Sequence, residues 1–449
     1  MTEPIAIVGA GLSGNLLAIL LAREGFAVTV YERNPAPGEA PRVAGRSINL
    51  ALAARGIRAL ELADAFAAVR PLLLPMRGRI VHESDRTERF LAYGGQRDEC
   101  IWSVSRHELN LKLLEFARER WRVDYRFEHS CIDLDVDRAV ATLRSPAGER
   151  QIGPRLLLAA DGAGSVIRRR LATAGRVAAR EDLLDHGYRE LTIPARADGA
   201  FALVPDGLHI WPRGGFMLIA LPNLDRTFTA TLFLPHEGRP GFDSVDSGNV
   251  AAFFAEHFSD ALPLMPALAR EYGDKPPGML GTVRCEPWSH TADRGGGCVL
   301  LIGDAAHAIV PFHGQGMNAA FEDCASLARL VAELGPAWPE VAERFEAARR
   351  DNARAIAEMA LENYDEMRDT VRDPAFERRA ALSFELERRF PGRFIPRYSM
   401  VMFHPEIGYA EAQRRGRIQA GILDEATAAG DDAASLGLAC TLVEQRLRL

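Results

Sequence analysis

The feature that most constrains the fold is the glycine-rich stretch IAIVGAGLSG near the start of the chain. The apolar run Ile5–Val8 precedes three glycines in the spacing Gly9-x-Gly11-x-x-Gly14, and a helical pattern continues to residue 24. This order predicts a strand, a tight turn and a helix. Gly9 permits the turn, Gly11 lets the backbone approach a pyrophosphate, and Gly14 lets the helix pack on the strand. The N-terminus is therefore predicted to bind a dinucleotide.

A second strand, Ala27–Glu32, completes this unit and ends in a carboxylate. Glu32 lies 18 residues after Gly14, where it can accept hydrogen bonds from ribose hydroxyls. The glycine fingerprint by itself fits NAD and FAD equally, so an NAD-dependent dehydrogenase remains an alternative at this point.

Two later strand ends favour FAD. The strand Leu156–Ala160 runs into Asp161, and the strand Val299–Ile302 runs into Gly303-Asp304. Asp304 can bind a ribityl hydroxyl. The backbone amides of Gly316, Met317 and Asn318, at the expected start of a long helix, can stabilise negative charge on a reduced flavin. A simple NAD domain does not require three such strand ends.

Composition narrows the class of protein. The 449 residues suffice for two or three domains, and the net charge of −7 argues against nucleic acid as a partner. The six cysteines are scattered without metal-ligand spacing, so we expect reduced thiols, no metal site and a cytoplasmic protein. Pro4–Ala22 is uncharged but is better explained as strand, turn and buried helix than as a membrane span. We expect a soluble protein without a membrane anchor, because the tail CTLVEQRLRL is charged and too short to span a bilayer.

The middle of the chain has the pattern of an antiparallel sheet. Short apolar segments at 208–212, 216–223 and 227–234 are bounded by turn residues, and the last alternates strictly. Arg77 and Arg79 lie in an apolar strand context at a spacing of two residues. Either both are solvated, or they point at an anion. Arg79 with the hydroxyl of Tyr93, on the expected return strand, would make a carboxylate clamp.

The glycine fingerprint, the Asp161-Gly162 segment and the Gly303-Asp304 segment, in this order, resemble the FAD-dependent aromatic hydroxylases, which are single-component flavoprotein monooxygenases. Longer stretches narrow the resemblance to the kynurenine 3-monooxygenase family. They are GRSINLALAARG, MRGRIVH, IWSVSRHELN, HGYRELTIP, LHIWPRG, IALPNLDRTFTATLFLP, GDAAHAIVPFHGQGMNAAFEDC, ALENYDEMR and FIPRYSMV.

This resemblance implies an α/β fold: a Rossmann-like, glutathione-reductase-like FAD domain with an inserted antiparallel sheet domain and a C-terminal helical region. The expected boundaries are 1–75, 101–175 and 290–338 for the FAD domain, 76–100 and 176–289 for the substrate-binding sheet, and 339–449 for the helices.

The resemblance also implies site residues. For FAD they are Ser13, Tyr31, Glu32, Arg33, Asn34, Ala51, Arg106, Cys131, Asp304, Met317 and Asn318. For the substrate they are Arg79, Tyr93, Asn363 and Tyr398 at the carboxylate, with Leu208, Ile219, Phe233, Pro311 and Phe312 around the ring. The stretch 45–56 is expected beside the flavin, with Ile48, Leu50 and Leu52 holding it to the core. His313 replaces a phenylalanine of relatives, so we assign it no catalytic role.

The implied reaction is NADPH- and O2-dependent 3-hydroxylation of L-kynurenine in tryptophan degradation, through a C4a-hydroperoxide of tightly but non-covalently bound FAD. Two alternatives remain open: a hydroxylase of another aromatic acid, and a non-catalytic FAD-binding scaffold.

Overall fold

The computed structural model describes residues 5–39, 49–95, 99–274, 276–293, 296–368, 374–428 and 432–447. The chain divides into two compact units, each built from three separate segments. Unit 1 comprises Met1–Leu73, Val104–Leu183 and Gly281–Ala357, and unit 2 comprises Leu74–Ser103, Leu184–Leu280 and Glu358–Leu449. The first part of the helical region 339–449 belongs to unit 1 and the rest to unit 2.

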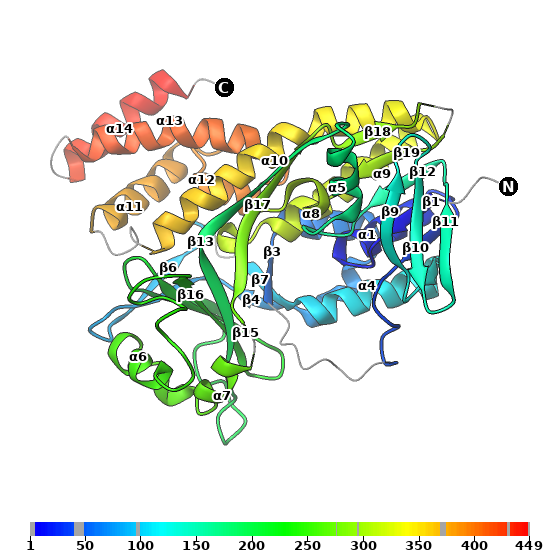
Figure 1. Cartoon of the computed structure of the whole chain (residues 1–449). Coiled ribbons are helices and arrows are strands. Elements are labelled where there is room, and N and C mark those ends of the chain that lie inside the picture. The colour runs from blue at the N-terminus through cyan, green and yellow to red at the C-terminus, as the bar shows by residue number, and fades with distance from the viewer. Residues whose placement is uncertain are drawn as a thin grey trace. The chain divides into compact units, whose positions relative to one another are not determined.

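Unit 1 is built around a six-stranded sheet in the order β18-β19-β12-β1-β2-β8. The strands are β18 (Ser289–Thr291), β19 (Cys298–Leu301), β12 (Leu156–Ala159), β1 (Ile5–Val8), β2 (Val28–Tyr31) and β8 (Asp124–Arg126). All neighbours pair in parallel except β18 with β19. Strands β19, β12 and β1 lie side by side in this sheet (Figure 1). All three are buried throughout, as expected for short apolar runs in a parallel sheet. The predicted Rossmann-like arrangement is confirmed.

Helices cover this sheet and carry the loops of interest. Helix α1 (Leu12–Arg23) packs against α4 (Arg106–Trp121) and α9 (Gly316–Leu334), and α2 (Ala54–Leu62) packs against α9. The remaining elements of unit 1 are β3 (Asn49–Leu52), α3 (Phe66–Val69), η1 (Arg70–Leu72), β9 (Ser130–Asp135), β10 (Val140–Ser145), β11 (Gly148–Ile152), α5 (Val166–Thr173), α8 (Asp304–His307), η3 (Pro311–His313) and the first part of α10 (Trp338–Arg368).

Unit 2 contains a seven-stranded sheet in the order β17-β13-β16-β15-β14-β5-β6. Its strands are β17 (Gly278–Glu286), β13 (Ala178–Ile193), β16 (Phe228–Pro235), β15 (Met217–Pro222), β14 (Gly207–Pro212), β5 (Gly78–His82) and β6 (Glu88–Ala92), and the first residues of β13 and the last of β17 belong to unit 1. The predicted antiparallel pairing is confirmed for β13-β16-β15-β14 and for β5-β6. The pair β14-β5 is parallel, which was not expected. Strands β4 (Leu74–Met76) and β7 (Ile101–Ser105) are not part of this sheet and pair antiparallel with each other in a three-stranded sheet.

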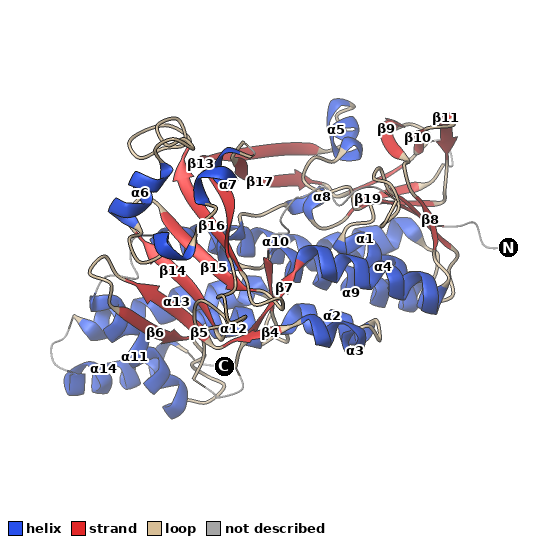
Figure 2. Ribbon diagram, turned by 90° about the horizontal axis from the view of Figure 1, so that it is seen from below, coloured by secondary structure: helices blue, strands red, loops and turns tan. Residues whose placement is uncertain are grey.

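One face of the unit 2 sheet packs on an aromatic core. Trp211, Phe254, Phe258 and Tyr272 are buried there, where α6 (Val250–His257), η2 (Leu262–Leu264) and α7 (Leu268–Gly273) cover the strands (Figure 2). Because the strands alternate, the residues between these core positions point to the opposite face.

The C-terminal helices form their own small core. It is built by α11 (Pro374–Arg389), α13 (Tyr409–Thr427) and α14 (Asp432–Arg446), with α12 (Arg397–Phe403) beside α13. The helical character predicted for this region is confirmed. Within the described ranges, no helix is both long and apolar enough to cross a bilayer.

Candidate active site

The three glycines of the turn in unit 1 do not all have the same explanation. Gly9 has φ +105°, and a Cβ there would lie 2.4 Å from the carbonyl oxygen of Ala160. A Cβ on Gly14 would lie 1.9 Å from the carbonyl oxygen of Gly9. The fold itself therefore demands glycine at both positions. At Gly11, by contrast, no described protein atom lies within 4 Å of such a Cβ. A close approach by a ligand would explain glycine there, and the N-terminus of α1 beside it has no side-chain cap.

Glu32 reaches this turn from the end of β2. Its carboxylate accepts hydrogen bonds from the amide of Ala10 (2.8 Å) and from the amide of Asn34 (2.9 Å). Tyr31 is buried, whereas Arg33 and Asn34 are exposed. The structure thus brings the predicted ribose-binding carboxylate into direct contact with the glycine turn.

The Asp161-Gly162 segment lies against the same turn, because the Cα of Asp161 is 3.1 Å from a Cβ built on Gly9. One carboxylate oxygen of Asp161 accepts from the amide of Val166 at 2.9 Å. The other, Oδ1, is buried and has no hydrogen-bond partner among the described residues. Burial raises the pKa of Asp161 and also raises the pKa of the Cys131 thiol to about 12, with the Asp161 charge adding to the second shift. An unpaired buried carboxylate oxygen suits a polar ligand group.

The third predicted strand end also lies at this place. Gly303 has φ +58°, and a Cβ there would lie 3.1 Å from Oγ of Ser13 in the first turn of α1. Asp304 follows as the exposed first residue of α8. The turns after β1, β12 and β19 therefore converge within unit 1. Arg106 is exposed at the first position of α4.

Asn318 joins the start of α9 to β3 and to the residue that follows it. Its buried side-chain amide donates to the carbonyls of Ala51 (2.8 Å) and Gly314 (2.9 Å) and accepts from the amide of Ala53 (2.9 Å). The sequence predicts a role for the backbone amide of Asn318, but it does not predict these hydrogen bonds of the side chain. Met317 is buried beside it.

The stretch GRSINLALAARG follows its predicted pattern only in part. Leu52 is buried as expected, but Leu50 is half-buried and the polar Asn49 is buried instead. The role expected of Leu50 in holding this stretch to the core is therefore met only in part. Residues 45–48, including Ile48, lie outside the described residues.

A buried ionic network, not predicted, supports this region. Arg55 pairs with Glu322 at 3.0 Å, and Arg349 pairs with Glu322 and Asp323 at 2.7 Å each. His307 contacts Asp323 at 2.6 Å. Burial would raise the pKa of Asp323, but the charges of His307 and Arg349 hold it below its usual value. The only signal in the sequence was an arginine inside an apolar stretch at Arg55.

In unit 2, Arg79 and Tyr93 form the predicted pair. Arg79 on β5 is only 7% exposed and Tyr93 is 4% exposed, so the solvated alternative is wrong for Arg79. It holds for Arg77, which lies just before the strand and is exposed. The amide of Tyr93 donates to the carbonyl of Arg77 at 3.1 Å, which confirms the return strand.

Residues far from Arg79 in the sequence complete the cluster around its side chain. The ring of Tyr398 stacks on that of Tyr93 at 5.3 Å, and the guanidinium of Arg79 lies 5.1 Å from the Tyr398 ring centre. Arg79 Nη2 donates to the Asn363 side chain at 3.4 Å, and Nη1 pairs with Glu366 at 3.2 Å. Glu366 was not predicted, although it lies three residues after Asn363 on α10 and thus on the same helix face.

Two buried donors in this cluster remain available. Arg79 Nε and the Tyr93 hydroxyl have no hydrogen-bond partner among the described residues. Burial raises the pKa of Tyr93 to about 12, so its hydroxyl remains a donor at neutral pH. Buried donors without acceptors are costly, and a ligand carboxylate would satisfy both.

The predicted apolar residues divide between the two units. The pairing register puts Leu208, Ile219 and Phe233 on the same face of the sheet as Arg79, opposite the aromatic core. Pro311 and Phe312 belong to unit 1, in the short turn η3, where Phe312 and His313 are buried.

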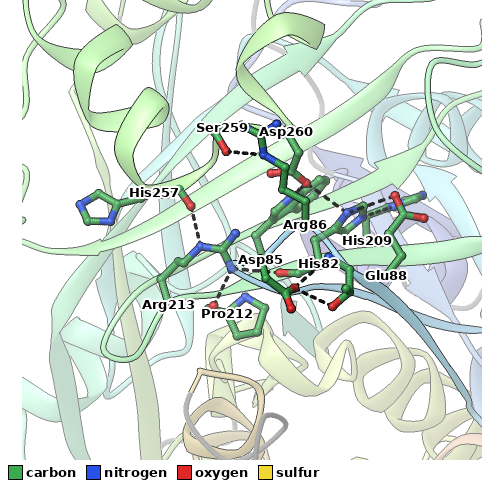
Figure 3. Close-up of polar contacts among 12 residues, drawn as sticks. His82, Asp85, Arg86, Glu88, His209, Pro212, Arg213, His257, Ser259 and Asp260 are labelled. Carbon is green, nitrogen blue, oxygen red and sulfur yellow. Dashed lines mark hydrogen bonds and ion pairs between the residues drawn. The ribbon is translucent and has the colours of Figure 1, made fainter.

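The other face of β5 carries a histidine pair that sequence analysis did not predict (Figure 3). His82 Nε2 lies 2.8 Å from His209 Nδ1, and His209 Nε2 lies 2.8 Å from the carbonyl of Val204. Because a carbonyl only accepts, His209 carries its proton on Nε2, and burial lowers its pKa to about 4. His82 therefore donates to His209.

His82 also contacts an acid. Its Nδ1 lies 3.3 Å from Asp260 (Figure 3). Asp260 also accepts from the indole of Trp211 at 2.7 Å, and the rings of His82 and Trp211 stack at 4.0 Å. Burial raises the pKa of Asp260, but hydrogen bonds from His82 and Trp211 lower it to about 2. The histidine pair therefore lies on the face of β5 opposite Arg79.

Comparison with known proteins defines the class first. A family model described as FAD binding domain matches residues 2–195 and 284–360. Among solved structures, 2-methyl-3-hydroxypyridine-5-carboxylic acid oxygenase matches with a TM-score of 0.66 and 20% identity, over 85% of this chain and 96% of that one. A probable FAD-dependent monooxygenase from Pseudomonas aeruginosa matches with a TM-score of 0.64 and 21% identity, over 82% and 97%. The fold and the converging turns are those of an FAD-dependent monooxygenase.

Sequence relatives then define the family. Kynurenine 3-monooxygenase of Stenotrophomonas maltophilia (strain K279a) is 46% identical over 96% of this chain and 93% of its own length. The Xanthomonas campestris enzyme of that name (strain 8004) is 47% identical over 94% and 92%, and the Xanthomonas oryzae enzyme (strain KACC10331 / KXO85) is 45% identical over 99% and 97%. The chain belongs to the kynurenine 3-monooxygenase family, whose members are FAD-dependent enzymes.

Proposed function

We propose that this enzyme catalyses the NADPH- and O2-dependent 3-hydroxylation of L-kynurenine, a step of tryptophan degradation. The observation that carries the proposal is a pair of buried donors, Arg79 Nε and Tyr93 Oη, which have no hydrogen-bond partner among the described residues, in a chain whose relatives are named for kynurenine. Unit 1 would bind FAD and unit 2 the substrate. L-Kynurenine has a carboxylate at one end and an aniline ring at the other, which matches an Arg–Tyr cluster beside an apolar sheet face.

FAD fits the residues of unit 1. Gly11 leaves room for a pyrophosphate at the start of α1, Glu32 would accept from the ribose, and Asp161 offers its unpaired oxygen. The amides at the start of α9 would face the flavin ring, with Asn318 holding that turn in place. When bound, FAD would supply the redox chemistry, namely acceptance of a hydride from NADPH and activation of O2, so that one oxygen atom enters the ring and the other leaves as water.

The protein would position the substrate and exclude water from the reaction. Arg79 and Tyr93 would hold the carboxylate, supported by Asn363 and Tyr398, and thereby fix the distance from that end to the ring. Leu208, Ile219 and Phe233 would cover the ring and exclude water. The aniline nitrogen donates electron density to its ortho carbon, so the substrate itself is nucleophilic and no protein nucleophile is required. The proposed partners are therefore small molecules: kynurenine, NADPH and O2.

A product count tests the proposal. NADPH consumption is followed with and without L-kynurenine, and 3-hydroxykynurenine and hydrogen peroxide are quantified in the same samples. We expect one hydroxykynurenine per NADPH. Oxidation that yields only peroxide with kynurenine, but coupled hydroxylation of another aromatic acid, would show a different substrate. Bound flavin that NADPH does not reduce would show a non-catalytic scaffold.

A further inference from the structure

The Arg79 cluster contains a second charge that the carboxylate clamp does not use. Glu366 pairs with Arg79 Nη1 at 3.2 Å, and its side chain is 28% exposed, whereas Arg79 is almost fully buried. The helix α10 presents Asn363 and Glu366 on one face, so an amide and an acid contact the same guanidinium. The cluster is therefore neutral before any ligand binds.

Because the cluster is neutral, it favours a ligand whose end group carries no net charge. A simple carboxylic acid would bring a second negative charge to one guanidinium and leave a net charge of −1 in a buried place, which is costly. A zwitterionic α-amino acid brings its own cation and leaves the cluster neutral. Its ammonium is one carbon from its carboxylate. With the carboxylate on Arg79, the ammonium would therefore lie within reach of the carboxylate that already contacts Arg79.

The other carboxylates near Glu366 on α10 are paired with other arginines and not with Arg79. Glu362 on the same helix pairs with Arg397, and Asp365 pairs with Arg368 at 3.2 Å. Burial raises the pKa of both Tyr93 and Tyr398, so neither ring carries a negative charge at neutral pH. Among the described residues, Glu366 is the carboxylate paired with Arg79.

We propose that Glu366 binds the α-ammonium group of the substrate and makes this site selective for α-amino acids over simple aromatic acids. The inference rests on the proposed function, because it takes Arg79 as the carboxylate site. Glu366 is a specificity-determining residue, and its effect is on binding rather than on the oxygen-transfer step.

The test compares L-kynurenine with its deamino analogue, 4-(2-aminophenyl)-4-oxobutanoate, which keeps the aniline ring, the ketone and the carboxylate. Dissociation constants for both are measured with the FAD-loaded wild-type enzyme and the variants Glu366→Gln and Asp365→Asn. Glutamine has the shape of glutamate and can still accept from Arg79. Asp365, 69% exposed and one residue away, is the matched control for removing a charge.

Losing a hydrogen bond between charged groups weakens binding by about ten- to a hundredfold. In Glu366→Gln we expect that loss for L-kynurenine, whereas the analogue binds as well as or better than in the wild type. The ratio of the two constants should collapse, and Asp365→Asn should preserve it. A merely structural role for Glu366 would weaken both ligands in parallel and would overturn the inference, as would a wild type that binds both equally. Because the readout is binding, a wild type that discriminates between the pair without hydroxylating kynurenine would defeat the proposed function alone.

Discussion

Replacing Gly11 by alanine separates what the fold requires from what the cofactor requires. Gly11 has φ −74°, which suits alanine, and a Cβ there meets no described protein atom within 4 Å. Gly14→Ala is the contrasting variant, because its Cβ would lie 1.9 Å from a backbone oxygen. Without FAD we expect Gly11→Ala to unfold within about 0.5 kcal/mol of the wild type. We expect Gly14→Ala to lose about 1–3 kcal/mol or more, since α1 must move off β1.

With FAD present, we expect Gly11→Ala to show an effect on the free energy of unfolding that the apoprotein does not show. FAD at a hundred times its dissociation constant adds about 2.7 kcal/mol to the free energy of unfolding. For a unit of about 200 residues this corresponds to a rise in Tm of roughly 5–11 °C. A methyl group that keeps the pyrophosphate from the Gly11 backbone removes about 1.5–3 kcal/mol of hydrogen bonding to a charged group. In Gly11→Ala the rise should therefore shrink to roughly half or less.

The assay is thermal unfolding of apoprotein with and without FAD, with FAD affinity measured separately by quenching of flavin fluorescence. The reasoning is refuted if Gly11→Ala lowers the apoprotein Tm as much as Gly14→Ala does. It is also refuted if Gly11→Ala binds FAD with wild-type affinity, because glycine would then be required by neither the fold nor the ligand.

Three further predictions concern other parts of the molecule. Arg79→Met should raise the KM for L-kynurenine by about thirtyfold or more, with Arg79→Lys restoring it only in part because lysine lacks the planar fork; unchanged steady-state kinetics would contradict the clamp. His209 is neutral when folded, with a pKa of about 4, below its unfolded value of about 6.5. As the pH falls between these values only the unfolded chain gains the proton, so denaturant titrations should show the free energy of unfolding decreasing by up to about 1.4 kcal/mol per pH unit. His209→Asn, which keeps an acceptor for His82, should lose this slope, and identical slopes would disprove the assignment. Cys131, whose pKa of about 12 results mainly from burial, should react with iodoacetamide at pH 8 roughly a hundredfold more slowly than an ordinary thiol. Mass spectrometry of the labelled peptide, with Cys131→Ser as control, checks this, and labelling at the rate of a free thiol would show that Cys131 is accessible.

Local signals in the sequence were sufficient for the nucleotide-binding half. The bounds of β1, α1 and β2 match their predicted ranges to within about a residue, because an apolar run, a glycine turn and a helical pattern are properties of adjacent residues. The same holds for β12 and β19. The convergence of their turns also follows from sequence, because parallel strands of one sheet end at the same edge.

Sequence alone did not decide which polar residues are buried. Arg77 and Arg79 are equivalent by spacing, but β5 begins at Gly78, so one is exposed and the other is enclosed. Leu50 is only half-buried while its neighbour Asn49 is buried, because a short strand has too few residues for its alternation to show which face is inside.

The sequence by itself determined the class of fold, the dinucleotide turn and, through resemblance, most of the residues expected at the substrate. Only the tertiary structure decided that Arg79 contacts Glu366 and that His82 lies between His209 and Asp260. The physical reason is distance along the chain. A charge or a hydrogen-bonding group in the interior must find its partner in space, and that partner can lie almost three hundred residues away, as Glu366 does from Arg79. The periodic pattern of apolar and polar residues in a sequence contains no information about such a pairing.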